Sequence, residues 1–299
     1  MTIKNANVHV LTGSIPAAQG ALEEGASKFA HRQIKAQEAE RSGFVPVIDD
    51  SFTARLGGAL WFKVRIQQRV IPPAAITELL DENIAAIEKV EGRKVFRKEK
   101  AAIKDEIIFD MLPKAPIVSK YVRGYLSDSG LLVVDSPSDT IVGHVLALIR
   151  EASGGLAALR PTCRTNHELV LSRIFLNPEE GESLNIVDNV TLQAEYEKAV
   201  GSGDVIFSDG FRDLCGCMNV VQATVEIGTK TRFILKSPYH YNKIQIPDYQ
   251  IDELEFSDDE EYAEAEALLC TQNIHDIFEA VGTQFGGWEH QEEMDLPGE

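Results

Sequence analysis

The chain has 299 residues, of which 44% are hydrophobic and 25% are charged, and its formal net charge is −18 at pH 7. This length and composition are typical of a globular protein with a substantial core. There is no run of about 18 apolar residues, which excludes a membrane-spanning helix, and the first residues lack the apolar core of a signal peptide. The four cysteines are few for this length, so we expect reduced thiols and a cytoplasmic protein.

The charged residues are unevenly distributed along the chain. Residues 244–299 contain seventeen Asp and Glu and no Lys or Arg, whereas residues 1–243 contain 29 basic and 30 acidic side chains. An acidic total argues against a nucleic acid as partner. A nucleic acid remains compatible with this chain if basic side chains gather on one surface and acidic side chains on another, and the uneven distribution favours such sorting.

Residues 1–158 are predicted to form an α+β region. Alternating patterns predict strands over residues 3–12, 43–47 and 59–67, and an Ala-rich helix is predicted from Ser14 to about Gln37. In the third strand, Lys63 and Arg65 fall on the face opposite to the apolar residues.

A helical hairpin is predicted over residues 72–114. Pro72 and Pro73 begin its first helix, because proline is tolerated in the first turn. Gly92 separates that helix from a second, basic helix that runs to about Met111. Strands over residues 117–127 and 131–135 and a helix from Ser136 to Gly154 complete the region.

Two further regions are predicted. Residues 159–241 form a strand-rich region, with strands over 167–176 and 203–210 and a hairpin over 220–236. Residues 242–299 hold a strand, then a helix from Tyr262 to about Val281 that packs back on the N-terminal region, and an acidic tail.

The stretch from residue 89 to 123 is the only strongly basic part of the chain. It contains ten Lys and Arg and five Asp and Glu, a net charge of +5. Four bases follow one another at steps of four, three and four residues, which on a helix places them along one stripe: Arg93, Arg97, Lys100 and Lys104. Lys94 and Lys98 lie on the neighbouring stripe. Like charges one turn apart destabilise a helix unless a polyanion neutralises them; the alternative is a solvated helix face.

Metal-binding patterns are incomplete. Cys215 and Cys217, together with Cys163 and His167, could supply four zinc ligands, but one intervening residue is an uncommon spacing for a zinc-binding cysteine pair. Reduced thiols in the core or in loops are therefore favoured, and we expect no metal site and no cofactor.

Catalytic patterns are equally incomplete. Asp105, Glu106 and Asp110 could indicate a metal-dependent nuclease, but the first two are adjacent on a helix and point in different directions, which favours a solvated face. Trp61 is predicted to be a core residue of its strand rather than a base-stacking residue. We expect no catalytic residues.

The sequence resembles the recombination-associated RdgC family. The resemblance rests on RKVFRKEK (93–100), IKDE (103–106) and MLPKA (111–115), on LSDSGLLVVD (126–135) and LALIREASGGL (146–156), and on LKSPYHY to IDELEF (235–256) and EAVGTQFGG (279–287). Residues 162–232 match the family only in length and in their pattern of strands and turns, and at the start of the chain only Ile3-Lys4-Asn5 aligns.

The resemblance implies an α+β fold of mixed sheets with a protruding helical hairpin, and a homodimer closed into a ring that encircles double-stranded DNA. RdgC-like proteins bind DNA with little sequence preference and limit the access of the strand-exchange recombinase; single-stranded DNA is a second expected ligand. We therefore expect a nucleoid-associated protein of the cytoplasm. The expected DNA-binding residues are a first tier of Arg93, Lys94, Arg97, Lys98, Lys100 and Lys104 and a second tier of Lys114, Lys120 and Arg123.

Two functions of other classes stay open. One is a metal-dependent DNA exonuclease, an activity also associated with the family, although no residue of this sequence stands out as its carrier. The other is a protein-interaction module that works through the acidic C-terminal region.

Overall fold

The computed structural model describes residues 2–228, 231–246 and 259–289. The strands are β1 (Ala6–Leu11), β2 (Glu40–Phe44), β3 (Thr53–Leu56), β4 (Ala59–Arg69), β5 (Ile117–Ser127), β6 (Leu131–Asp135), β7 (Ala158–Leu159), β8 (Asn185–Gln193), β9 (Lys198–Gly201), β10 (Asn219–Ile227), β11 (Thr231–Ser237) and β12 (His240–Gln245). The helices are α1 (Ile15–Ala26), α2 (Pro73–Glu91), α3 (Arg97–Met111), α4 (Asp139–Ser153), α5 (His167–Leu176), α6 (Asp209–Arg212) and α8 (Asp259–Gln284). Short 3-10 helices are η1 (Leu112–Lys114), η2 (Pro178–Glu180), η3 (Gly203–Phe207) and η4 (Asp213–Gly216).

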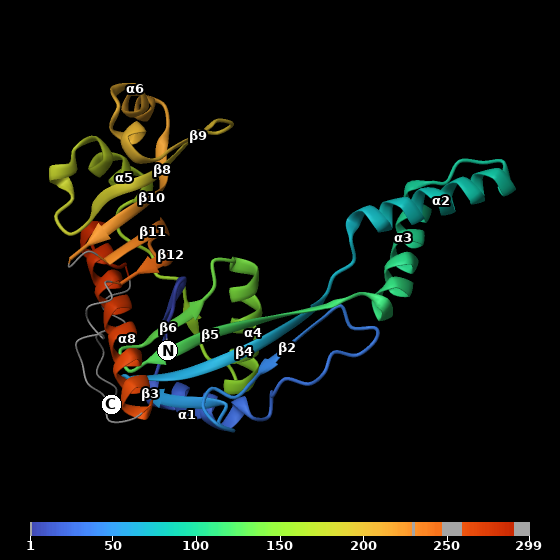
Figure 1. Cartoon of the computed structure of the whole chain (residues 1–299), viewed down its shortest axis with the longest axis horizontal. Coiled ribbons are helices and arrows are strands. Elements are labelled where there is room, and N and C mark those ends of the chain that lie inside the picture. Colours follow the sequence, from blue (N-terminus) through green and yellow to red (C-terminus); the bar gives the residue numbers. More distant parts are fainter. Residues whose placement is uncertain (1, 229–230, 247–258, 290–299) are drawn as a thin grey trace.

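The fold is α+β, as predicted, but it is built on one large antiparallel sheet rather than on several mixed sheets. Its strand order is β2-β4-β5-β6-β1-β12-β11-β10-β8-β9, with β3 against β4 and β7 against β1. β1 is the link, because it pairs with β6 on one side and with β12 on the other, where Ala6 lies opposite Tyr241 and Asn7 opposite His240. The N-terminal strands and the C-terminal strands therefore share a single sheet (Figure 1).

β4 and β5 form a long ribbon that projects from the body. They have eleven residues each and pair from Ala59 opposite Ser127 to Arg69 opposite Ile117. β6 pairs with β5 only between Gly124 and Leu126, so the outer part of β5 has no partner on that side. We call residues 63–69 and 117–123 of this ribbon the stem. The stem carries the helical hairpin of α2 and α3 away from the body, and stem and hairpin together form the arm (Figure 1).

The inner half of the ribbon is buried on both faces. Leu60, Phe62 and Val64 belong to the core beneath α1 and α4, as their alternation predicts. Trp61 lies on the opposite face, in the core that α5 and α8 cover, and its Nε1 donates to the Leu56 carbonyl at 3.1 Å. Trp61 is thus a core residue.

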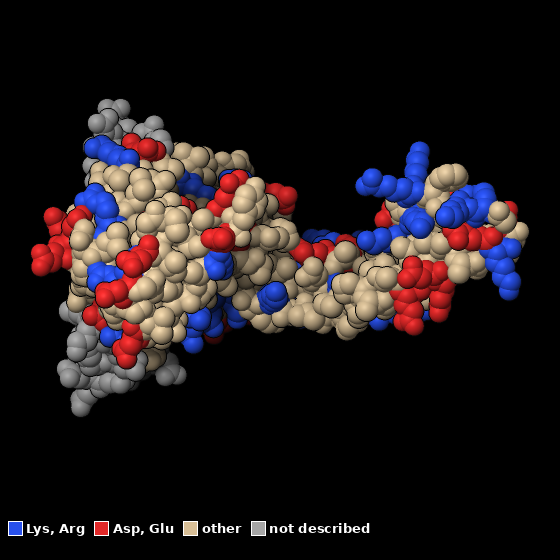
Figure 2. Space-filling view, turned by 90° about the horizontal axis from the view of Figure 1, so that it is seen from above, with Lys and Arg blue, Asp and Glu red and all other residues tan. Residues whose placement is uncertain are grey.

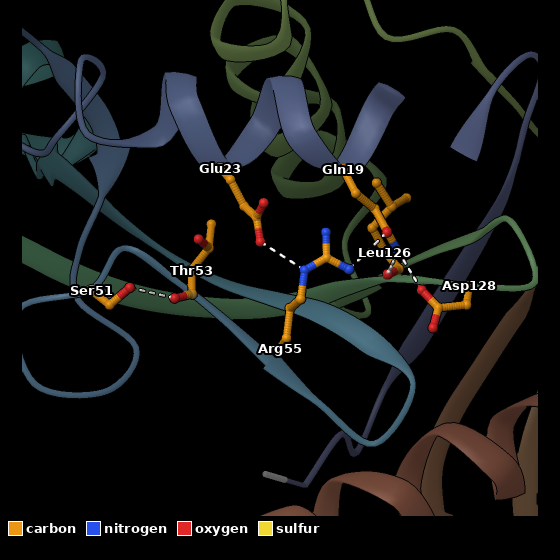
Figure 3. Close-up of polar contacts among 7 residues, drawn as sticks. All are labelled: Gln19, Glu23, Ser51, Thr53, Arg55, Leu126 and Asp128. Carbon is orange, nitrogen blue, oxygen red and sulfur yellow. Dashed lines mark hydrogen bonds and ion pairs between the residues drawn. The ribbon is translucent and has the colours of Figure 1, made fainter. Parts of the chain in front are cut away.

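A polar cluster holds α1 on the sheet (Figure 3). The buried Gln19 donates from Nε2 to the Leu126 carbonyl at 3.1 Å and to Asp128 Oδ1 at 2.8 Å. Arg55 of β3 donates from Nη1 to Gln19 Oε1 at 3.1 Å and from Nε to Glu23 Oε1 at 2.9 Å. One glutamine therefore ties the helix to β3 and to the end of β5.

α1 is shorter than predicted. It ends at Ala26 rather than near Gln37, because the following backbone enters the sheet region. The Phe44 N–H donates to the Phe29 carbonyl, and the His31 N–H donates to the Phe44 carbonyl. α4 also differs from its prediction, since it begins at Asp139 after Ser138 and not at Ser136.

Two predicted strands are wrong. Residues 167–176 form α5, whose first turn is capped by Asn166 Oδ1 through the N–H groups of Glu168 and Leu169. The buried side chains of α5 have helical spacing: Val170, Leu171, Ile174 and Phe175. Residues 203–210 form η3 and the start of α6, where the Ser208 hydroxyl accepts from the Phe211 N–H. The predicted hairpin over 220–236 is confirmed as β10 and β11.

α8 packs against both halves of the molecule. The Gly57 N–H donates to Glu264 Oε1 at 2.9 Å, and Thr271 Oγ1 donates to the Gly57 carbonyl at 2.8 Å. A side chain at Gly57 would meet the helix, since an added Cβ lies 2.3 Å from the Leu268 nitrogen. The predicted strand beyond residue 246 and the acidic tail from residue 290 lie outside the described residues. No helix in the described ranges is long and apolar enough to cross a membrane.

The crossing of α1 over α4 generates a stability prediction. A Cβ added at Gly25 would lie 1.8 Å from the Ala152 carbonyl oxygen, so Gly25→Ala should lower the free energy of unfolding by about 1–3 kcal/mol. Gly20→Ala is the matched control on the same helix, because nothing lies within 4 Å of its added Cβ, and alanine favours helix. Urea titration of both variants checks this; equal stability would show that α1 and α4 separate freely.

Candidate nucleic-acid interface

The turn between α2 and α3 is built by residues 92–96. Gly92 ends α2 in the left-handed conformation, with φ of 65°, and its N–H donates to the Glu88 carbonyl. The side chain of Val95 is buried, and its N–H donates to Glu88 Oε1 at 3.1 Å. α3 therefore begins only at Arg97, and Arg93 and Lys94 lie in the turn. The predicted four-base helical stripe is wrong for Arg93.

Arg93 is engaged by two carboxylates. Its guanidinium donates to both oxygens of Glu99 at 2.9 and 2.8 Å, and it also pairs with Glu91 at 2.6 Å. Hydrogen bonding to Arg93 lowers the pKa of the Glu99 carboxyl. Arg93 braces the turn in this way, and its charge is already neutralised.

The other predicted tip cations are free. Arg97, Lys100 and Lys104 keep steps of three and four residues on α3, and so share one stripe. Lys98 lies beside that stripe, whereas Lys94 lies in the turn before α3, so the predicted neighbouring stripe is wrong for Lys94. All five side chains are exposed, and within the described part of the chain no carboxylate forms an ion pair with any of them. Figure 2 shows Lys and Arg side chains gathered around the outer end of the arm. We call these five residues the tip cations.

Within the helical hairpin, a net positive charge is found only in the turn and the first part of α3. Residues 93–104 contain six bases and one acid, a net charge of +5. α2 contains one base and five acids, a net charge of −4. A polyanion is therefore attracted to the end of the hairpin and repelled by the helix that leads to it.

The second-tier residues are not brought together. Lys114 lies in η1 at the base of the hairpin. Lys120 and Arg123 lie three residues apart on β5, so their side chains point to opposite faces of the stem. In the register, Lys120 lies opposite Ile66 and Arg123 lies opposite Lys63.

Sequence reasoning missed the basic face around Arg123. Lys63 and Arg65 of β4 share this face with Arg123 and Tyr121 of β5, since Lys63 pairs with Arg123 and Arg65 with Tyr121. The Lys63 ammonium lies 5.2 Å from the centre of the Tyr121 ring, and the Arg65 guanidinium carbon lies 5.6 Å from it. We call these four residues the basic stem face. The alternation of residues 59–67 predicted that Lys63 and Arg65 share a face, but not that β5 adds an aromatic ring and a third base.

The described residues hold no group of three or more His, Cys, Asp or Glu side chains suited to a metal ion. The four cysteines are free thiols, and burial raises the pKa of the Cys163 thiol to about 12. Asp105, Glu106 and Asp110 are exposed on α3. Neither the zinc hypothesis nor the nuclease hypothesis thus has a ligand cluster in this part of the chain.

Comparisons with known proteins identify the family. A family model described as "RdgC: Putative exonuclease, RdgC" matches residues 1–288. The Recombination-associated protein RdgC of Halorhodospira halophila is 32% identical over 161 residues, 53% of this chain and 53% of that protein, so this alignment spans about half of the relative. The protein of the same name from Psychromonas ingrahamii is 25% identical over 304 residues, 96% of this chain and 99% of that protein. The one from Neisseria meningitidis is 24% identical over 250 residues, 80% of this chain and 84% of that protein. The chain therefore belongs to the RdgC family.

Proposed function

We propose that this protein binds double-stranded DNA without sequence preference, that two copies close a ring around it, and that the bound ring limits access of the strand-exchange recombinase. The observation that carries the proposal is the group of five exposed and unpaired tip cations in a chain of net charge −18. Curated relatives are named recombination-associated proteins, which supports this setting. The protein then works on the nucleoid, in the cytoplasm.

The chemistry of the tip suits phosphate rather than bases. Long Lys and Arg side chains on a solvated helix neutralise backbone phosphates, and these contacts position a protein on DNA without reading its sequence. The negative charge of α2 and of the chain as a whole disfavours binding at other surfaces. Together they orient the DNA against the end of the arm.

The shape of the chain supports a ring. The arm and the strand-rich region around β8 and β10 extend to the same side of the molecule, which gives the chain a bent outline (Figure 1). Apolar side chains are exposed near both ends. On the arm, α2 buries none of its residues, and a groove of about 430 Å³ between α2 and α3 is lined by Val70 and Leu79. In the strand-rich region, Val200, Val205 and Phe207 are more than half exposed.

Because apolar surfaces lie at two separate ends of the chain, two copies of the protein can contact each other at two separate places. Exposed apolar patches mark interaction sites, and a two-fold dimer that uses both ends of a bent chain closes on itself. A closed ring holds DNA by topology, so contacts with phosphate alone suffice to retain it. A ring that occupies the duplex also denies that stretch to the recombinase.

Two alternatives remain to be separated from this proposal by experiment. The family description names a putative exonuclease, although the described residues contain no metal-binding carboxylate cluster. An acidic protein-interaction module would work through residues 244–299, many of which lie outside the described ranges. The first predicts that DNA is shortened, and the second that DNA is not bound.

Charge reversal at the tip tests the binding site. Arg97→Glu with Lys100→Glu should weaken binding similarly on all duplex sequences and lower the slope of log affinity against log salt by about two, because two phosphate contacts are lost. The matched control is Lys28→Glu with Arg150→Glu, which makes the same charge change at two exposed bases of the body and should leave the slope unchanged. Unchanged affinity in the charge-reversed variant would move the site away from the tip.

The two faces of the stem give a second prediction. A duplex that touches one face cannot reach both Lys120 and Arg123, and the face of Arg123 also holds Lys63 and Arg65. Arg123→Ala should therefore weaken binding severalfold, whereas Lys120→Ala should stay within about twofold of wild type. Fluorescence anisotropy at moderate salt measures both. A larger loss from Lys120→Ala would place DNA on the opposite face.

Retention on circular DNA tests the ring and, with divalent metal present, the exonuclease alternative. Protein loaded at low salt should survive a high-salt wash on a closed circle and slide off a short linear duplex of the same sequence. The same incubations with Mg²⁺ or Mn²⁺ should leave the linear DNA at full length. If the wash removes the protein equally from both DNAs, the ring is excluded and binding is explained by an electrostatic surface. Shortened linear DNA favours the exonuclease.

A further inference from the structure

Tyr121 lies at the centre of the basic stem face with one side of its ring open. Both cations that approach the ring, Lys63 and Arg65, come from β4. On the other side of β5, the described residues include no partner strand at this position, because pairing with β6 begins only at Gly124. The side chain of Tyr121 is 56% exposed. Among the described residues, the cations in contact with the ring both come from the β4 side, and the β6 side of β5 has no strand at this position.

The cations around Tyr121 are held in place. Arg65 donates from Nε and Nη2 to Ser119 Oγ at 3.3 and 3.0 Å, and Gln67 donates to the same hydroxyl at 3.3 Å. Among the residues that the structure describes, Lys63, Arg65 and Arg123 form no ion pair with a carboxylate. The stem thus presents three cations without a counter-ion beside an exposed aromatic ring.

This combination suits an unpaired nucleotide better than a duplex. In a duplex the base faces are stacked on one another, so phosphates can meet the three cations but leave the tyrosine ring unused. An unpaired base offers its face to an aromatic side chain, and a cationic groove that also holds an aromatic platform is the usual construction for single-stranded nucleic acid. Cations close to the ring add a cation–π contribution.

We propose that the basic stem face binds an unpaired nucleotide, with the base stacked on the open side of Tyr121 and its phosphates against Lys63 and Arg123. This inference rests on the proposed function and deepens it. The tip cations hold the duplex backbone, and the stem gives the protein a preference for DNA that contains a single-stranded gap. The alternative is that the cation–π contacts only stabilise the exposed ribbon.

Binding to three DNAs of equal length separates these possibilities: an intact duplex, the same duplex with a short single-stranded gap, and the single strand. Tyr121→Ala should weaken binding of the gapped and single-stranded DNA roughly tenfold and leave the intact duplex within about twofold. Tyr121→Phe keeps the ring and should resemble wild type. Val118→Ala is the matched control, because Val118 is 45% exposed on the opposite face of the same strand.

A photochemical cross-linking experiment uses the wild-type protein, so its result does not depend on whether a variant folds. A 5-iodouracil placed in the gap should cross-link to the peptide that contains Tyr121, whereas a cross-link confined to other peptides overturns the proposal. The proposal is also overturned if Tyr121→Ala weakens binding equally on all three DNAs, or weakens it on none. The proposed function is kept in either case if the wild-type protein binds the intact duplex with an affinity that depends on salt. Absence of binding to every DNA by wild type overturns both.

Discussion

The pairing of β4 with β5 is the constraint on which the arrangement of this molecule depends. At the inner end of the ribbon, Phe62 and Trp61 are buried on opposite faces, which fixes the register of the pair. A slip of one residue would exchange the faces and force each side chain into the core on the other side of the sheet, which is packed for different side chains. Because the register is fixed in the core, it is also fixed along the stem, since both belong to one ribbon of eleven residue pairs. The core thereby determines which bases share a face and where the helical hairpin is held.

At the tip, one base has a structural role and the other bases stay exposed. Arg93 pairs with Glu91 and Glu99, and this bracing holds the turn from which Lys94 and the first turn of α3 project. Like charges stacked one turn apart cost a few tenths of a kcal/mol per pair. The remaining tip cations carry that cost with no described carboxylate to relieve it, and a polyanionic ligand removes it on binding. The acidic α2 beside them limits that relief to the end of the arm.

The sequence predicted the features that depend on residues close to one another along the chain. The prolines before α2, Gly92 after it and the alternation of β4 indicated the hairpin and its strand. The apolar run at 167–176 was ambiguous between strand and helix, and Asn166 followed by Glu168 was the capping signal that favours a helix. Pairing between segments that are far apart in the chain could not be predicted from the sequence. Neither the placement of Tyr121 between Lys63 and Arg65 nor the junction of Asn7 with His240 follows from spacing along the chain.

Under the two proposals, the arm combines two ways of recognising DNA that require no base sequence. Flexible cations at the tip respond to charge density, which every duplex presents equally. A fixed aromatic ring among cations on the stem responds to whether a base is free to leave the stack, which depends on DNA structure. The proposed restraint of recombination would draw on both, because recombinases act where duplex and single strand meet. The two surfaces lie on one continuous ribbon and the hairpin it carries, so a DNA bound at the tip would also lie near the stem.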